Sequence, residues 1–394
     1  MLLSTLPLFA TAQKKAISQA KTYIKSGRDL DKAVKLMEDL LKDSTFRRNE
    51  KVWLTMGDAV KMQYDQGNRK LYLKQQYDTA SLFAKAKDLF HIYECLDSLD
   101  ATPNKKGKID LNYRDKHAHV LNALRPNLYN GAAYYLRKHD FKNAWAFDDT
   151  YLECGTKPLF NEYKYLDNDT LMPKAAYRAL YSAYRLGEIN KMKKYVELAE
   201  RDSTKLENIV QYMAEVQLKD KDTISYVASL KRGFKLSPSH PFFFPRLVDY
   251  YNAKAMTDSA TVFIDNALAT DSANVLFLFA KSTVLLNDKN YEQCLDITTK
   301  LLEINDSMPE AYCNMGLVYY NQALELDKTM QRSRKKRQAV NNLYEKSRPY
   351  MEKFRELAPQ QQAKWVPALY TIYLYLNMGK EFEEIDRLRE TLKL

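Results

Sequence analysis

Three histidines and a cysteine in the N-terminal part of the sequence have a spacing that could bind a metal ion. His91 and Cys95 lie four residues apart, so they would share one face of a helix, and His117 and His119 follow on a later segment. Imidazole and thiolate groups are ligands that zinc accepts. The alternative is ordinary packing, because Cys95 follows the apolar Phe90 and the His-x-His pair lies in a stretch rich in Lys and Arg. We favour packing, and we expect no metal and no cofactor.

Motifs of the common enzyme classes do not occur in the sequence. With 10 Gly in 394 residues there is no GxGxxG and no GxxxxGK[ST] loop that could hold a nucleotide phosphate. GxSxG, HExxH and paired CxxC motifs are also missing, and the 4 Cys have no disulfide-framework spacing. We therefore expect a protein that is not an enzyme and has no small-molecule substrate. An enzyme whose residues are scattered over a binding groove is the open alternative.

A dense basic run is the next chemical feature. It consists of Arg332, Arg334, Lys335, Lys336 and Arg337, in a chain with 61 Lys and Arg, 50 Asp and Glu and a formal net charge of +11. Such a cluster can bind phosphates, lipid headgroups or nucleic acid by releasing counterions. Acidic and amide residues flank the run, so we favour the alternative of a lengthened, solvated helix. Nucleic acid is not our first choice of partner.

The elements that must carry these residues repeat along the chain. A period of 34 residues holds without a gap through starts at positions 173, 207, 241, 275 and 309. The eighth position of the unit is mostly small, as closely packed helices require: it reads Leu180, Ala214, Val248, Ser282 and Gly316. Apolar residues recur at helical spacing on both sides of a turn such as Gly187-Glu188. This pattern predicts an all-α protein built from pairs of helices.

The fifth unit shows a family resemblance. Its first helix reads PEAYCNMGLVYY from Pro309 to Tyr320, its second helix contains Tyr344 to Ser347, and Leu357-Ala358-Pro359 ends the unit. These stretches resemble the tetratricopeptide repeat family, whose unit is two antiparallel helices, and about nine such units are legible in the chain. The resemblance implies an α-α superhelix, a right-handed solenoid of antiparallel helix pairs. Stability in such arrays is nearly additive along the chain.

The period also indicates how the chain is organised. Segments at about 64–76, 100–124 and 159–172 break the period, and we expect loops or extended helices there. The final stretch alternates large apolar with charged residues, which suits a cap on the open end of the core. The predicted organisation is a truncated signal peptide at 1–12, N-terminal units at 13–99, an irregular unit with insertions at 100–172, a regular array at 173–359 with a basic insertion near 326–343, and a cap at 360–394.

The first residues are similar to an export signal. Leu2 to Phe9 is apolar, and Ala10-Thr11-Ala12 has the small-x-small pattern of a signal-peptidase site, so we predict cleavage after Ala12. The basic segment that should precede the run is missing, which a start codon assigned too late would explain. A signal peptide would make the protein periplasmic or associated with the envelope of a Gram-negative bacterium; the alternative is the apolar start of a helix in a cytoplasmic protein. No other run reaches about 18 apolar residues, so we expect no membrane span.

The resemblance also implies where a partner would bind. In the family, positions 2, 5, 9, 12 and 13 of the first helices line a concave groove that holds an extended peptide or a partner helix. Carried over position by position, the groove residues are Tyr129, Arg137, Lys174, Tyr177, Tyr181, Tyr184, Arg185, Gln211, Glu215, Lys219, Asp249 and Asn252. Tyr177, Tyr181 and Tyr184 form one stripe at i, i+4 and i+7. Such rings beside cations suit an acidic or aromatic peptide, unless the stripe packs against the 159–172 insertion.

We therefore predict a scaffold that binds a peptide or helix of another protein in this groove and has no chemistry of its own. The alternative function is binding of an envelope polyanion through the insertion Arg332–Arg337. The family's carboxylate clamp needs Lys at position 5 and Asn at position 9, whereas position 5 here holds residues such as Tyr177, Gln211 and Pro245. Capture of chaperone tails is therefore not implied.

Overall fold

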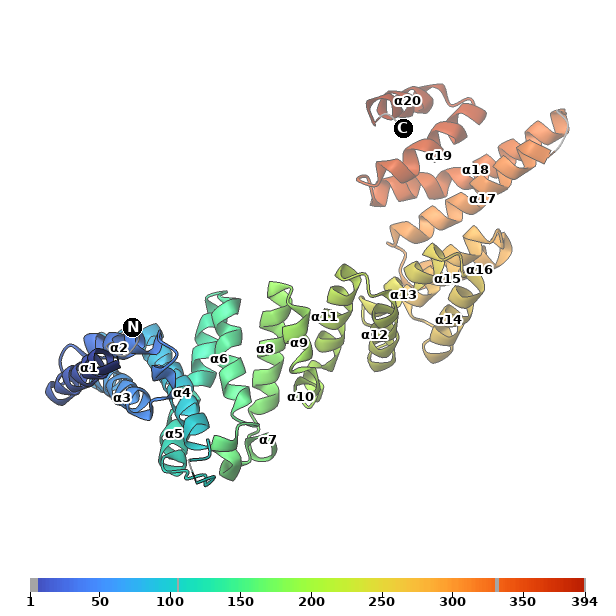
Figure 1. The fold of residues 1–394 in the computed structure, drawn as a ribbon. Coiled ribbons are helices and arrows are strands. Elements are labelled where there is room, and N and C mark those ends of the chain that lie inside the picture. The colour runs from blue at the N-terminus through green and yellow to red at the C-terminus, as the bar shows by residue number, and fades with distance from the viewer. Residues whose placement is uncertain (1–5, 105, 330–332, 393–394) are drawn as a thin grey trace, which may run out of the picture. The chain divides into compact units, whose positions relative to one another are not determined.

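The structure is a computed structural model that describes residues 6–104, 106–329 and 333–392. These residues form twenty α-helices and three short 3-10 helices, and no strand occurs among them. The chain divides into two compact units, unit 1 at residues 1–222 and unit 2 at residues 223–394. Within each unit, consecutive helices lie side by side as antiparallel pairs (Figure 1). The fold class is therefore all-α, as the helical periodicity predicted.

Unit 1 has one continuous core. Its helices are α1 (Leu6–Ser26), α2 (Leu30–Leu41), α3 (Glu50–Tyr72), α4 (Thr79–Asp100), α5 (Arg114–Arg137), α6 (Phe141–Glu153), α7 (Tyr165–Asn168), α8 (Met172–Leu186), α9 (Ile189–Lys193), α10 (Val196–Ala199) and α11 (Leu206–Lys219), with the 3-10 helices η1 (Phe46–Arg48), η2 (Pro158–Tyr163) and η3 (Ser203–Lys205). Side-chain caps begin several of them; the Asp78 carboxylate, for example, accepts the Ala80 and Ser81 N–H groups at the start of α4. The apolar sides of these helices meet in a single cluster that extends from Ala20 to Val216.

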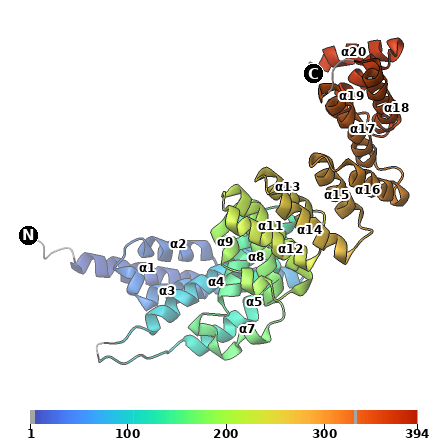
Figure 2. The same ribbon diagram turned by 90° about the vertical axis from the view of Figure 1, so that its right-hand side faces the viewer.

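The three segments that break the period have different structures in unit 1. The first lies in the C-terminal part of α3 and the turn after it. The second includes the long connection between α4 and α5, which runs out from the helices of the unit (Figure 2). The third folds as η2 and α7 and buries Leu159, Phe160 and Tyr165. One insertion thus becomes part of the core, while another projects from it.

Unit 2 has several smaller cores. Its helices are α12 (Thr223–Leu236), α13 (Phe243–Ala253), α14 (Thr257–Thr270), α15 (Val275–Asn287), α16 (Tyr291–Ile304), α17 (Pro309–Thr329), α18 (Arg334–Leu357), α19 (Gln362–Tyr375) and α20 (Gly379–Leu392). Buried residues gather around Phe244, around Cys294, around Leu301 and around Tyr344, in separate clusters. The basic insertion lengthens both α17 and α18, and Ser333 caps α18 by accepting the Lys336 N–H at 3.1 Å.

The 34-residue period is visible in the backbone. The helices α8, α11, α13, α15 and α17 begin within two residues of the five predicted starts. Gly187, Lys221, Ala255 and Lys289 lie 34 residues apart, and their φ angles are +74°, +61°, +53° and +61°. After each of them, the next N–H returns to a carbonyl of the first helix, as from Met256 to Tyr251 at 2.9 Å. This is the hydrogen bond that closes a helix at a left-handed residue, for which glycine is the usual choice.

Candidate binding surface

Helix α8 has a buried side of small residues and a second side of tyrosines. Ala175, Ala176, Ala179 and Ala183 are fully buried, so α8 lies close to its neighbours in the core. Residues spaced by four and three positions lie on a shared face of a helix, which places Tyr177, Tyr181 and Tyr184 together. All three tyrosines are partly exposed. The predicted stripe is therefore present on α8 and is accessible at its edge.

Tyr212 of α11 joins this stripe to the next helix pair. Its ring stacks on Tyr184 with centroids 4.4 Å apart, and it lies 5.6 Å from the Tyr181 ring. The Tyr184 hydroxyl donates a hydrogen bond to Glu215 Oε2, and Gln211 Nε2 donates to Glu215 Oε1 at 2.9 Å. The four rings form one surface, which we call the tyrosine face: Tyr177, Tyr181, Tyr184 and Tyr212.

Two phenols of the tyrosine face, Tyr184 and Tyr212, are held in the neutral form. The hydrogen bond to Glu215 is the main cause that raises the pKa of Tyr184 to about 12. Burial is the main cause that raises the pKa of Tyr212, and its hydrogen bond with Tyr177 adds to the shift. At neutral pH the surface thus offers apolar rings with polar, uncharged tips, a combination suited to a partly wet interface.

Cations surround these rings. The Arg185 guanidinium lies 4.5 Å from the ring centroid of Phe141, and its Nη1 donates to the Tyr181 hydroxyl at 2.8 Å. The Phe141 ring is edge-on to Tyr181 at 6.1 Å. The ammonium of Lys205 lies 5.7 Å from the Tyr177 ring centroid. The surface is therefore aromatic in its centre and positively charged around it.

The structure brings together half of the predicted groove residues. These are Tyr177, Tyr181, Tyr184, Arg185, Gln211 and Glu215. Arg137, Lys174 and Lys219 are exposed on α5, α8 and α11. Tyr129 belongs to a neighbouring site, since its ring lies 4.3 Å from the Arg178 guanidinium. The last two, Asp249 and Asn252, are exposed on α13 of unit 2.

The groove positions of the family did not predict three residues of this surface. Tyr212 is the sixth residue of its unit, Phe141 begins a second helix, and Lys205 precedes the predicted unit start. None of these places corresponds to a groove position of the family. Aromatic and basic residue types were the available signal, but the rotation of α11 against α8 decides which of them reach the stripe.

The 159–172 insertion is anchored on α4, α5 and α6. Asp169 Oδ2 accepts a hydrogen bond from Arg125 Nη1 and another from the Tyr151 hydroxyl, both at 2.5 Å. The Arg125 guanidinium lies between two rings, 3.7 Å from the centroid of Tyr151 and 3.8 Å from that of Tyr165. The Phe160 ring packs on a phenylalanine of α4 at 6.0 Å. The rings that contact the tyrosine stripe come instead from α6 and α11.

Of the residues considered as metal ligands, His117 packs in the core, and His91 and Cys95 lie close together on α4. Cys95 Sγ lies 3.9 Å from His91 Nε2, but His117 is buried against Tyr93, with ring centroids 4.0 Å apart. Burial lowers the pKa of His117 to about 4, so this ring is a neutral packing residue. Among the residues that the structure describes, no group of three or more His, Cys, Asp or Glu side chains is arranged to hold a metal ion.

The basic run is partly internal. Arg332 lies outside the described residues. Arg334, Lys335 and Arg337 are exposed in the first turns of α18. Lys336 is only 6% exposed, and its ammonium donates to the Asp327 carbonyl. One of the five predicted cations, Lys336, therefore forms a hydrogen bond within the pair of helices α17 and α18.

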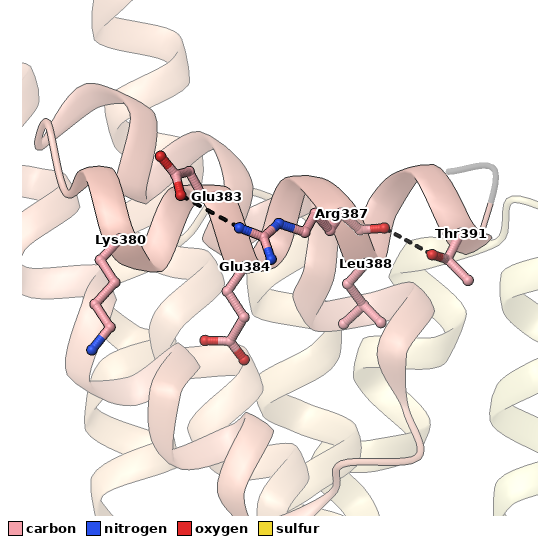
Figure 3. Close-up of a pocket in the computed structure, with 6 residues that line it drawn as sticks. All are labelled: Lys380, Glu383, Glu384, Arg387, Leu388 and Thr391. Carbon is pink, nitrogen blue, oxygen red and sulfur yellow. Dashed lines mark hydrogen bonds and ion pairs between the residues drawn. The ribbon is translucent and has the colours of Figure 1, made fainter.

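A hollow of about 660 Å³ along α20 is lined by charged residues (Figure 3). Arg387 and Glu383 form an ion pair across one helical turn at 3.5 Å, and Thr391 Oγ1 donates to the Arg387 carbonyl at 2.9 Å. Across the described part of the chain, no helix combines the length and the apolar character that a membrane crossing requires.

Comparison with solved structures finds helical repeat proteins, although no protein-family model and no curated protein sequence matches the chain. The C-terminal part of a TPR repeat-containing protein from Cytophaga hutchinsonii matches with a TM-score of 0.42 and 13% identity, over 65% of this chain and 92% of that one. A human IFIT1 dimer with m7Gppp-AAAA matches with a TM-score of 0.36 and 14% identity, over 93% and 65%. Yeast Tom70 matches with a TM-score of 0.29 and 14% identity, over 98% and 96%.

The fold is tetratricopeptide-like. That assignment stands on this chain's own antiparallel helix pairs and on its 34-residue period. At identities of 13% and 14%, the likeness to the solved structures concerns the fold alone and says nothing of a shared partner.

Proposed function

We propose that the protein is a non-enzymatic scaffold that binds a peptide segment or a helix of another protein on the tyrosine face. The observation that carries this proposal is the continuous aromatic surface that Tyr181, Tyr184 and Tyr212 form across two helix pairs, with Arg185 at its edge. Tyrosine and arginine side chains supply much of the binding energy of protein interfaces. Rings that are already in place lose little freedom when a partner binds.

The charges around the tyrosine face favour an acidic or aromatic segment as the ligand. Exposed Lys174, Arg185 and Lys219 contribute positive charge on α8 and α11. Glu215 is an acidic residue within this surface, but it already accepts hydrogen bonds from Tyr184 and Gln211. An acidic segment would therefore meet complementary charge, which favours its encounter and its specificity.

Affinity capture from cells of the native host tests this proposal with matched charge reversals. Arg185→Glu changes the edge of the tyrosine face, whereas Lys193→Glu makes the same change at an exposed position of α9. We expect a specific protein partner to be captured by the wild type and by Lys193→Glu, and to be lost with Arg185→Glu. A thermal melt of each variant establishes that it is folded. Capture of the same proteins by both variants would contradict the proposal.

The export signature supports a second proposal, that residues 1–12 are removed as a signal peptide. Helix α1 runs from Leu6 through Ala12 to Ser26, so cleavage would shorten it and keep its buried Ala20. N-terminal sequencing of the protein from its native host is the test. Gln13 as the first residue would support export, and an N-terminus upstream of Ala12 would contradict it.

A further inference from the structure

A cavity of about 810 Å³ lies in unit 2. On one side it is bounded by the end of α17 and the basic start of α18, and on the other by the turn that joins α19 to α20. It is lined by Asp327, Ser333, Arg334, Lys336, Arg337, Val340, Leu374, Tyr375 and Asn377. The insertion creates it, because the lengthened α17 and α18 bring the start of α18 beside the end of α19. A volume in this range holds a few side chains of a ligand.

One wall of the cavity is held by internal bonds. The Tyr375 hydroxyl donates to Asp327 Oδ2 at 2.9 Å, and the Lys336 ammonium donates to the Asp327 carbonyl and lies 3.6 Å from its Oδ1. The negative charge of Asp327 is thus balanced within the protein. Asp327 is also the one acidic residue among those that line the cavity.

Two arginines of the lining supply positive charge to the cavity. Arg334 and Arg337 lie three residues apart, both line the cavity, and both are exposed. Within the described residues, neither has an acidic partner at ion-pair distance. Guanidinium groups bind carboxylates through two parallel hydrogen bonds, so a pair of them selects an anionic ligand.

An apolar wall stands beside these cations. Leu374 is 48% exposed and lines the cavity together with the buried Val340. A ligand that satisfies both walls carries carboxylates next to an apolar side chain. A long polyanion gains its affinity from many cations in a row, whereas the described lining of this cavity offers two cations outside any ion pair, Arg334 and Arg337. Charge and apolar surface together therefore favour a peptide over a polyanion.

We infer that this cavity binds an acidic peptide segment that has an apolar side chain beside its carboxylates. The site lies in unit 2 and is independent of the tyrosine face in unit 1. It is distinct from the function proposed above, and either site can fail without the other.

The test is the fluorescence anisotropy of a fluorescein-labelled decapeptide of glutamate with two central leucines, titrated with the full chain. Arg334→Gln with Arg337→Gln is expected to weaken binding about tenfold or more, since two charge-assisted contacts are lost. Lys328→Gln with Lys335→Gln removes the same charge from exposed neighbours that do not line the cavity. We expect this control pair to change the affinity by less than about threefold, as exposed charges contribute little.

A second pair of measurements tests whether the apolar wall contributes to peptide binding. Leu374→Ser is expected to weaken binding of the leucine-containing peptide, and to leave unchanged the weaker binding of a peptide with serine in place of both leucines. Arg185→Glu on the tyrosine face should leave the affinity for the decapeptide unchanged. A thermal melt of each variant establishes that it is folded. Arg334, Lys335 and Arg337 lie in the first turn of α18, where basic residues oppose the helix dipole, so their loss is not expected to destabilise that helix.

Three outcomes would overturn the inference. Wild-type chain that does not bind the peptide, or that binds it equally well without Arg334 and Arg337, would mean that the cavity takes no acidic peptide. Equal weakening by the cavity pair and the control pair would show diffuse attraction to the hairpin, as expected for a polyanion site, and a heparin probe would then compete in the same way.

Discussion

The two units bury charge differently. In unit 1, the fully buried Asp148 accepts from Arg178 Nε at 2.7 Å and from its Nη2 at 2.5 Å, and Arg125 pairs with Asp169 between two tyrosine rings. In unit 2, the helix pairs meet through apolar clusters such as Phe234, Phe244, Phe263 and Phe277, and an ion pair such as Lys281–Asp265 leaves its carboxylate half exposed.

This difference follows the regularity of the sequence. The segment that breaks the period supplies Asp169, which ties the insertion to α5 and α6. The described helix pairs of unit 2 bury apolar residues against their sequence neighbours, so each cluster forms locally. We therefore expect unit 1 to unfold as one body and unit 2 to respond to damage mainly near its position, as in nearest-neighbour repeat arrays.

The largest effect is expected from Asp169→Ala in unit 1. It leaves the guanidinium of Arg125 buried without its counter-charge, which costs about 3–5 kcal/mol of unfolding free energy. Asp65→Ala removes the exposed partner of Lys61 and should change stability by less than about 0.5 kcal/mol. Denaturant unfolding with hydrogen exchange measures both. If Asp169→Ala reduced amide protection only within η2 and α7, unit 1 would not unfold as one body, and the contrast between the two units would be wrong.

The next effect is a pH dependence that His117 gives to unit 1. Its pKa is lowered from 6.5 to about 4, first by burial and then by Lys116. Between these two pH values the unfolded state therefore binds a proton that the folded state does not bind. Stability is therefore present above pH 6.5 and falls by up to about 3 kcal/mol as the pH drops toward 4. Denaturation midpoints of wild type and His117→Phe, which keeps a stacked ring, should diverge over this window. Parallel curves would exclude this role.

A medium effect compares how damage spreads in the two units. A Cβ at Gly233 would lie 2.2 Å from the Phe243 ring in unit 2, and one at Gly131 would lie 2.7 Å from the Phe147 ring in unit 1. Each change to alanine should cost about 1–3 kcal/mol through overpacking. Hydrogen exchange should show loss around α12 and α13 for Gly233→Ala, and loss across unit 1 for Gly131→Ala. The same extent of loss in both would contradict the comparison.

The smallest effect concerns the repeated turns. Ala255 has a φ of +53°, which costs a side chain about 1 kcal/mol, so Ala255→Gly should stabilise unit 2 by up to that amount. Gly187→Ala, at the same turn of a pair in unit 1, should destabilise by a similar amount. The measurement is the urea concentration at the midpoint of unfolding, compared among variants whose free energy of unfolding falls with urea at the same slope. Stability that does not change in either variant would mean that these turns carry no strain.

The helix pairs could be predicted because their spacing is a packing requirement. Gly316, for example, must be small, since a Cβ there would lie 2.5 Å from the Met351 sulfur. The i, i+4, i+7 stripe of tyrosines on α8 could be predicted for the same geometric reason. Such local constraints leave a periodic trace in the sequence.

Contacts between pairs leave no such trace. Whether Tyr212 stacks on Tyr184 depends on the rotation of α11, which no spacing records. The prediction that the basic run is a solvated, lengthened helix holds for the helix but not for Lys336, whose ammonium reaches the Asp327 carbonyl nine residues earlier. That contact depends on how the start of α18 lies against the end of α17, which the sequence pattern does not specify.

The most direct test of the scaffold proposal is site-specific photo-crosslinking in cells of the native host. The photoreactive residue p-benzoylphenylalanine would replace Tyr181 on the tyrosine face or, as a control, Tyr72, whose side chain in unit 1 is 85% exposed. We expect a covalent adduct with a specific protein at position 181 that is absent at position 72 and disappears with Arg185→Glu. The same adducts at both positions, or an adduct at position 72 alone, would contradict it.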